Sequence, residues 1–102
     1  MKRVLVRYRV KPDRVRENED LVRAVYEELG QARPEGIRYA TFRGNDGVSF
    51  FHIASIESPD DKNPLPSLAA FKRFTENIEE RCDEPPKLFE LTEIGSYRFF
   101  LD

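Results

Sequence analysis

The sequence has no tryptophan, one cysteine (Cys82) and one histidine (His52) among its 102 residues. A single cysteine excludes an internal disulfide framework. One histidine and one cysteine, without carboxylates clustered at ligand spacing, do not make the donor set of a zinc-type centre. We therefore expect no metal site, and we expect Cys82 to be a buried, inert thiol.

Long apolar runs and an excess of positive charge are also missing. No apolar stretch approaches the roughly 20 residues that span a membrane, and segment 1–10 lacks the apolar core and cleavage site of a signal peptide. The 17 basic residues are balanced by 19 acidic residues, for a net charge of −2, which does not favour binding to nucleic acid. These absences predict a cytoplasmic protein with neither a membrane nor nucleic acid as its partner.

What the sequence does contain is a globular composition. Hydrophobic residues make up 39%, with eight phenylalanines and four tyrosines, enough for a packed core. The length predicts one domain spanning residues 1–102.

The segment Val48–Glu57 is the longest strand-like run, and it carries the only histidine. Aromatic and β-branched residues alternate along it, and successive side chains of a strand point to opposite faces. Both faces are apolar, so this strand is expected at the centre of a sheet.

Hydrophobic periodicity and turn residues predict five further elements: strand 2–11, helix 14–29, strand 37–43, helix 67–82 and strand 96–101. Asp13 and Ser67 are expected to cap the two helices, and Gly30 to end the first. Segment 88–94 fits a helical turn or an extended lead-in. Segment 44–47, Gly-Asn-Asp-Gly, suits the tight turn of an antiparallel hairpin.

The order strand, helix, strand, strand, helix, strand predicts an α+β fold. With adjacent elements packing and right-handed crossovers, βαββαβ gives a ferredoxin-like plait: a four-stranded antiparallel sheet with two helices on one face and the first and third strands at its centre.

The side chains of the two central strands are then assigned to faces. In the first strand Val4, Val6 and Tyr8 are expected against the helices, with Leu5, Arg7 and Arg9 on the helix-free face. In the third strand, Phe51 and Ile53 are expected against the helices. The remaining side chains are expected on the helix-free face: Val48, Phe50, His52, Ala54 and Ile56.

Such an open apolar face is larger than soluble monomers usually leave bare. A second copy in a two-fold dimer is its simplest cover. We expect the dimer interface to include Leu5, Val48, Phe50 and Ala54. The enclosed cavity is expected to hold Arg7, Arg9, Phe50, His52 and Ile56.

His52 is the candidate catalytic residue of this cavity, because an unperturbed histidine titrates near neutral pH. The alternative is a histidine with a purely structural hydrogen bond. Arg7 and Arg9 could bind a carboxylate in bidentate fashion, or pair with acidic side chains at the rim of the sheet.

The order and spacing of several segments resemble the antibiotic-biosynthesis-monooxygenase-like family of dimeric α+β-barrel proteins. These segments are Val10-Lys11-Pro12, the hairpin from Tyr39 to Phe51, Ile56-Glu57-Ser58, Ser67-Leu68 and the closing segment from Glu84 to Phe100. The resemblance implies a homodimer with one cavity per subunit. It also implies oxidation of an aromatic or quinol-type small molecule by oxygen without a cofactor.

The sequence departs from the enzymatic members of that family at three positions. Ile56 stands where a tryptophan is common, Ala54 where a glutamate is common, and Phe71 where a histidine is common. A haem-degrading role is disfavoured on this ground. The alternatives are a non-catalytic small-molecule-binding or interaction domain of the same fold and, more distantly, the RNA-recognition plait, for which strand one lacks a stacking aromatic.

Overall fold

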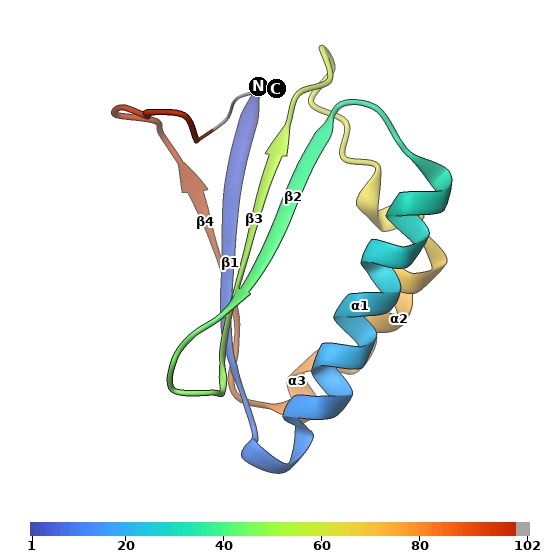
Figure 1. Ribbon diagram of the computed structural model, residues 1–102, viewed down its shortest axis with the longest axis vertical. Coiled ribbons are helices and arrows are strands. Elements are labelled where there is room, and N and C mark those ends of the chain that lie inside the picture. The colour runs from blue at the N-terminus through green and yellow to red at the C-terminus, as the bar shows by residue number, and fades with distance from the viewer. Residues whose placement is uncertain (100–102) are drawn as a thin grey trace.

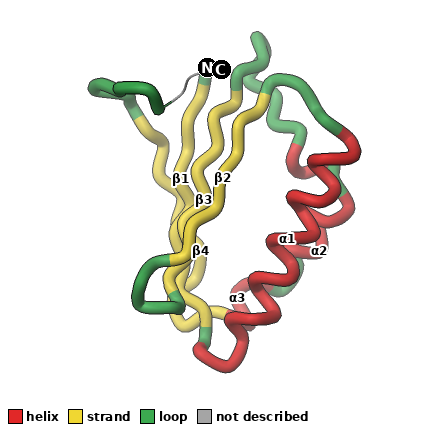
Figure 2. Tube along the Cα trace, in the orientation of Figure 1, coloured by secondary structure: helices red, strands yellow, loops and turns green. Residues whose placement is uncertain are grey.

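The computed structural model describes residues 1–99 and has the predicted βαββαβ order (Figure 1). Its main elements are β1 (Lys2–Val10), α1 (Val15–Ala32), β2 (Ile37–Arg43), β3 (Ser49–Ile56), α2 (Ala69–Thr75), α3 (Ile78–Arg81) and β4 (Cys82–Leu91). The four strands form one sheet in the order β2-β3-β1-β4, with antiparallel neighbours. Figure 2 shows the helices as one layer on a single side of the sheet. The predicted α+β plait is confirmed.

The turn between β2 and β3 closes the predicted hairpin. Gly47 has a φ of +82°, a conformation that glycine adopts without a steric penalty. The Asp46 carboxylate accepts hydrogen bonds from the Ser49 hydroxyl and from the backbone N–H groups of Val48 and Ser49. These bonds, the Ser49 hydroxyl first, lower the pKa of Asp46 to about 2.

The first helix begins and ends differently from the prediction. Arg14 is its N-cap and no side chain caps it, so the expected cap by Asp13 is wrong. The helix continues through Gly30 to Ala32, and Arg33 takes the left-handed conformation that ends it. Isolated glycine is tolerated inside a helix at a cost of about 1 kcal/mol, which packing of the apolar face outweighs here.

The second helix is interrupted. Asn77 adopts a left-handed conformation with φ of 57°, and it separates α2 from the single turn of α3. Ser67 is not the N-cap, because its hydroxyl donates to the Pro64 carbonyl instead. The carboxylate of Glu28 on α1 accepts a hydrogen bond of 2.7 Å from the Ala70 N–H. One helix therefore satisfies a free donor at the start of the next.

The last strand is β4, formed by residues Cys82–Leu91, so the predicted strand 96–101 is wrong. Residues 96–99 are not in a strand, and 100 and 101 lie outside the described residues. Segment 83–86, which contains Pro85 and Pro86, predicts the end of the second helix, and α3 does end before it, at Arg81. The two prolines lie in β4 because it is an edge strand, next to a register shift opposite Arg7 and Arg9, where proline is tolerated.

The assignment of the third strand to faces is also wrong. Its partners across the ladder are Tyr8 for Phe50, Val6 for His52 and Val4 for Ala54. Residues paired directly across a ladder share a face. Phe50, His52, Ala54 and Ile56 are therefore buried under the helices, whereas Phe51 and Ile53 lie on the helix-free face.

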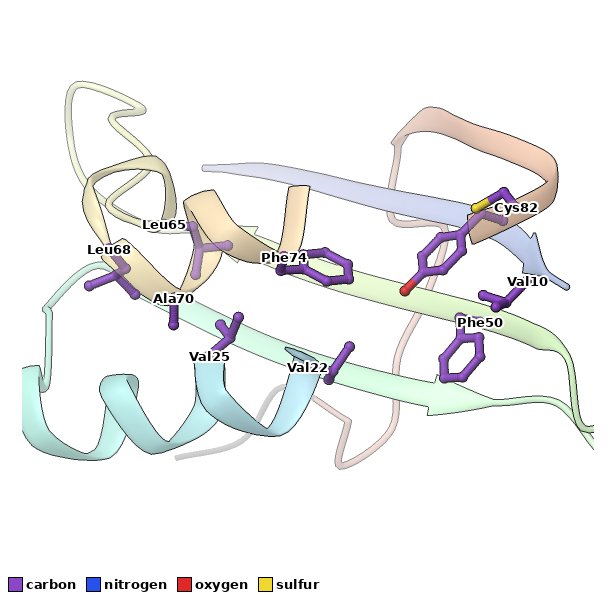
Figure 3. Close-up of a cluster of buried hydrophobic side chains, with 10 residues drawn as sticks. Val10, Val22, Val25, Phe50, Leu65, Leu68, Ala70, Phe74 and Cys82 are labelled. Carbon is purple, nitrogen blue, oxygen red and sulfur yellow. The ribbon is translucent and has the colours of Figure 1, made fainter. Parts of the chain in front are cut away.

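The core lies between this face and the helices (Figure 3). Tyr8 stacks on Phe50 with ring centroids 5.5 Å apart, and Phe74 of α2 lies 6.2 Å from Tyr8. The remaining buried apolar side chains of this cluster are Val10, Val22, Val25, Leu65, Leu68, Ala70 and Cys82. Cys82 is buried as expected, at the start of β4 and not on a helix.

The helix-free face retains apolar side chains, although not the predicted ones. The alternation and register of the four strands place seven of them there: Leu5, Ala40, Phe42, Phe51, Ile53, Phe89 and Leu91. Phe42 is 52% exposed. Arg7 and Lys87 each lie over the ring of Phe89, and Arg9 pairs with Glu84. We call this surface the open face.

Candidate functional site

A cavity of about 270 Å³ lies between the helix-covered face of the sheet and the helices α2 and α3. Its wall is largely apolar, as small-molecule sites usually are. Residues from four strands and both short helices line it: Val4, Val6, Tyr8, Tyr39, His52, Ala54, Asn63, Leu65, Phe71, Phe74, Thr75, Ile78, Pro86 and Leu88.

The break in the second helix shapes this cavity. Phe71 and Phe74 come from α2, and Ile78 comes from α3 after the left-handed turn at Asn77. Leu88 on the edge strand is 63% exposed. It marks a side on which the cavity opens, because α2 and α3 do not cover β4 to its edge.

The polar end of the cavity is built around His52, which is 4% exposed. Its Nε2 lies 2.8 Å from the Tyr8 hydroxyl. Its Nδ1 lies 2.7 Å from the Tyr39 hydroxyl and 2.9 Å from Thr41 Oγ1. The Thr41 hydroxyl is in turn 2.7 Å from that of Tyr26 on α1. Both ring nitrogens of His52 therefore have hydrogen-bond partners.

The network continues into the helix layer on the other side of Tyr8. Asn18 of α1 donates from Nδ2 to the Tyr8 hydroxyl at 2.9 Å. The side chain of Arg81 donates from Nε and from a terminal nitrogen to Asn18 Oδ1, each at 3.3 Å. Arg81 also donates to the carbonyls of Phe74 and Glu76, so a single side chain links the interrupted helix to the network.

Burial keeps the cavity's titratable groups uncharged. Desolvation lowers the pKa of His52 to about 4, and it raises the pKa values of Tyr8 and Tyr39 well above the usual tyrosine value. At neutral pH, His52 and both tyrosines are therefore neutral. The charge closest to them in the network is Arg81, 3% exposed, and no carboxylate of residues 1–99 forms an ion pair with it.

The predicted cavity residues are not brought together. His52 lines the cavity. Phe50 and Ile56 are buried on the same face as His52, but they are not among the lining residues. Arg7 and Arg9 lie on the open face, on the opposite side of the sheet from His52, so they cannot share a ligand with it.

The predicted interface residues are divided in the same way. Leu5 lies on the open face as expected, whereas Phe50 and Ala54 are buried beneath the helices. These two side chains cannot form an interface across the open face. Val48 is half-buried and precedes β3, where its carbonyl accepts a hydrogen bond from Val10 N–H.

Four polar residues of the site were not predicted as members: Asn18, Thr41, Tyr26 and Arg81. For Tyr8 and Tyr39 the sequence leaves two alternatives, a hydrogen bond to a ligand or packing as amphipathic strand aromatics. Strand alternation could have found Thr41, because the hairpin register places it opposite His52. Asn18 and Arg81 had no such signal, since helical position alone does not tell that a polar side chain is buried.

The described part of the chain has neither a cluster of metal-binding side chains nor a helix that could span a membrane. Across residues 1–99, no three histidine, cysteine, aspartate or glutamate side chains gather closely enough to hold a metal ion. The helices in the same range are too short or too polar to span a bilayer.

Comparison with solved structures identifies the architecture. A protein from Nitrosomonas europaea, provisionally assigned as an antibiotic biosynthesis monooxygenase, superposes with a TM-score of 0.75 at 17% identity, over 91% of this chain and 89% of that one. An antibiotic biosynthesis monooxygenase superposes with a TM-score of 0.73 at 16% identity, over 93% of this chain and 100% of the other. The fold is that of antibiotic-biosynthesis-monooxygenase-like proteins.

A conserved protein from Methanosarcina mazei Go1 has the same architecture, with a TM-score of 0.71 at 18% identity, covering 88% of this chain and 89% of its own. No protein-family model matches the sequence, and no curated protein does. At these identities the likeness establishes the fold alone.

Proposed function

We propose that this protein binds a small aromatic or quinol-type molecule in the cavity between its sheet and α2 and α3, and oxidises it with molecular oxygen without a cofactor. The observation that carries the proposal is the cavity itself: an apolar chamber with aromatic walls and one hydrogen-bonding end at Tyr39 and His52. An aromatic molecule with one oxygen substituent matches both parts of that chamber.

The chemistry requires the substrate to supply the electrons. An anthrone or quinol that has lost a proton to solvent before it binds is an electron-rich enolate or phenolate, which reduces oxygen directly. For an anthrone, one oxygen atom becomes the new carbonyl, and the other leaves as water with the two hydrogens of the oxidised carbon. The protein's part is to bind the ring, exclude water and hold the substrate oxygen against the neutral side chains at the polar end.

We also propose that the protein is a homodimer formed through the open face. Support comes from the seven apolar side chains there, among them Phe42 at 52% exposure and Leu91 at 40%. Soluble monomers rarely leave a continuous apolar surface of this kind bare. A two-fold axis would place each sheet against an identical copy, with Arg7 and Arg9 at its basic margin.

Oxygen consumption with a panel of anthrones and quinols tests the catalytic half of the proposal. The wild type is expected to consume oxygen, and Phe71→Trp, which fills the cavity from α2, is expected to abolish both turnover and thermal stabilisation by the same compounds. A matched control is Phe42→Trp on the open face, which leaves the cavity volume unchanged.

A non-catalytic binding protein of the same fold is the second candidate. It is favoured by the occupation of both His52 nitrogens, which leaves no free base at the polar end among the described side chains. Thermal stabilisation by these compounds with no oxygen consumption would identify this case.

A further inference from the structure

The hydrogen bonds at the polar end run in one donor-to-acceptor order from residue to residue. Arg81 sets this order, which we call the direction of the network. A guanidinium can only donate. Asn18 Oδ1 accepts two of its N–H groups, so the oxygen of the Asn18 amide faces Arg81 and its nitrogen faces Tyr8. The amide orientation follows from the partners and does not depend on telling oxygen from nitrogen.

The direction passes through Tyr8 to His52. The Tyr8 oxygen accepts from Asn18 Nδ2, and Tyr8 is 1% exposed, so its own proton must go to a buried acceptor. The partner in place is His52 Nε2 at 2.8 Å. Since a buried donor left unpaired costs free energy, Tyr8 donates and His52 Nε2 accepts. The neutral imidazole therefore carries its proton on Nδ1.

The last member of the network is Tyr39. The Nδ1–H of His52 points to the Tyr39 oxygen at 2.7 Å and to Thr41 Oγ1 at 2.9 Å. When Tyr39 accepts this bond, its own O–H is left to donate elsewhere. Tyr39 lines the cavity, so an oxygen of a bound molecule is placed to accept that proton.

We propose that Tyr39 is the residue that binds the ligand's oxygen, as a hydrogen-bond donor, and that Arg81, Asn18, Tyr8 and His52 are positioning residues that fix this direction. The cavity then selects molecules that present an acceptor there: a ketone, a quinone carbonyl or an enolate. It disfavours ligands of equal size that present only a donor. This inference rests on the proposed function for the binding site and adds its selectivity.

His52 provides a direct test of the direction, because it is the only histidine in the chain. The ¹⁵N spectrum of the imidazole, recorded at pH 8, distinguishes the two neutral tautomers without assignment ambiguity. We expect the proton on Nδ1. A proton on Nε2 overturns the proposal.

An Asn18→Asp variant should reverse the direction with almost no change in shape. A carboxylate accepts from Arg81 and offers no N–H to Tyr8, so Tyr8 donates to it and accepts from His52 Nε2–H. We expect the imidazole proton to move to Nε2. The matched control is Tyr26→Phe, which removes a hydroxyl bonded to Thr41 and should leave the proton on Nδ1. An unchanged tautomer in folded Asn18→Asp contradicts the role of Asn18.

Ligand selectivity is tested with three probes of similar size: 1-tetralone as an acceptor, 1-naphthylamine as a donor and naphthalene as the apolar reference. Tyr39→Phe should weaken 1-tetralone binding about fivefold and naphthalene binding less than twofold. In folded Asn18→Asp the preference should shift from 1-tetralone toward 1-naphthylamine. Equal losses for 1-tetralone and naphthalene overturn the role of Tyr39.

The results separate this inference from the proposed function. If none of the three probes binds the wild type, the proposed function and the ligand contact of Tyr39 both fail. The tautomer of His52 then still decides the direction of the network. If the probes bind without the expected selectivity, the cavity stands and the inference about Tyr39 is wrong. Should Asn18→Asp not fold, the wild-type tautomer and Tyr39→Phe decide the matter.

Discussion

Phe50 and Phe51 are neighbours on β3, and they belong to opposite sides of the sheet. Phe50 is 2% exposed and stacks on Tyr8, whereas Phe51 lies half-buried on the open face. The side that holds Phe50 has a cavity and a hydrogen-bonded network. The side that holds Phe51 is apolar, with Arg7, Arg9 and Lys87 beside it. We propose that the first side binds the ligand and that the second associates with another copy of the protein.

The difference between the two sides has a simple cause. Helices α1, α2 and α3 all lie over one face of the sheet (Figures 1 and 2). Polar side chains on that face lose water and must pair with one another, as His52, Tyr8 and Asn18 do. Side chains on the other face keep their solvent unless a second molecule covers them.

The largest expected effect separates the two phenylalanines. Phe50→Ala should lower the free energy of unfolding by about 3–5 kcal/mol, because it leaves a void beside Tyr8. Phe51→Ala, the matched control, should cost the protomer about 1 kcal/mol or less, since its side chain is already partly in water. Urea unfolding at a concentration where the protein is monomeric measures both. Equal losses would contradict the assignment of the two faces.

The second prediction concerns the pH dependence that buried His52 imposes. Burial lowers its folded pKa to about 4, below the unfolded value of about 6.5. Between about pH 4 and about pH 6.5 the folded state therefore binds fewer protons than the unfolded state. This contribution to stability is fully present above pH 6.5 and is lost as the pH falls toward 4. We expect it to account for about 2 kcal/mol between pH 7 and pH 5.

Urea unfolding of the wild type and of His52→Gln at the two pH values isolates that contribution, because glutamine does not titrate. The wild type should lose about 2 kcal/mol more than the variant. Equal losses in the free energy of unfolding of the two proteins would show that folding does not lower the pKa of His52.

The third prediction tests the open face as an interface. Phe42→Asp should weaken the dimer at least about tenfold, or about 1.4 kcal/mol, since the two-fold axis would bury a carboxylate from each copy beside the uncharged Phe51. Sedimentation equilibrium measures the dissociation constant, and circular dichroism confirms that the protomer is folded. Glu17→Gln on α1 serves as a control outside the interface. A wild type that sediments as a monomer at all concentrations contradicts the dimer.

The smallest expected effect lies in the helix layer itself. Glu28→Ala removes the carboxylate that accepts the Ala70 N–H at 2.7 Å, and it should cost about 1 kcal/mol, as loss of a helix cap does. Glu27→Ala, one residue earlier on the exposed side of α1, should cost less than half as much. Thermal unfolding compares the two variants. Identical midpoints would show that the Glu28 carboxylate does not stabilise the start of α2.

The sequence was sufficient for the architecture, because strand alternation, helical spacing and the Gly-Asn-Asp-Gly turn are local signals. It was not sufficient to decide which alternate side chains of β3 point toward the helices. Phe50 and Phe51 are equally apolar, and only the register against Tyr8 on β1 decides which of them the helices cover. The predicted site therefore combined His52 with Arg7 and Arg9 from the other side of the sheet.

The edge strand was misplaced for a related reason. Pro85 and Pro86 are breaker residues in a local pattern, and their tolerance in β4 depends on its outer position, which is a property of the whole sheet. Asn18 and Arg81 could not be foreseen as partners either, since 63 positions of sequence separate them. Their pairing follows from the break at Asn77, which turns Arg81 toward α1.

The most direct test of the central claim is a map of amide chemical shifts on addition of 1-tetralone. The claim is that the ligand site lies under the helices and not on the open face. We expect the amides of Tyr39, His52, Phe71 and Phe74 to shift on binding, with those of Phe42 and Phe89 unchanged. Shifts confined to Phe42, Phe89 and their neighbours on the open face would contradict the account.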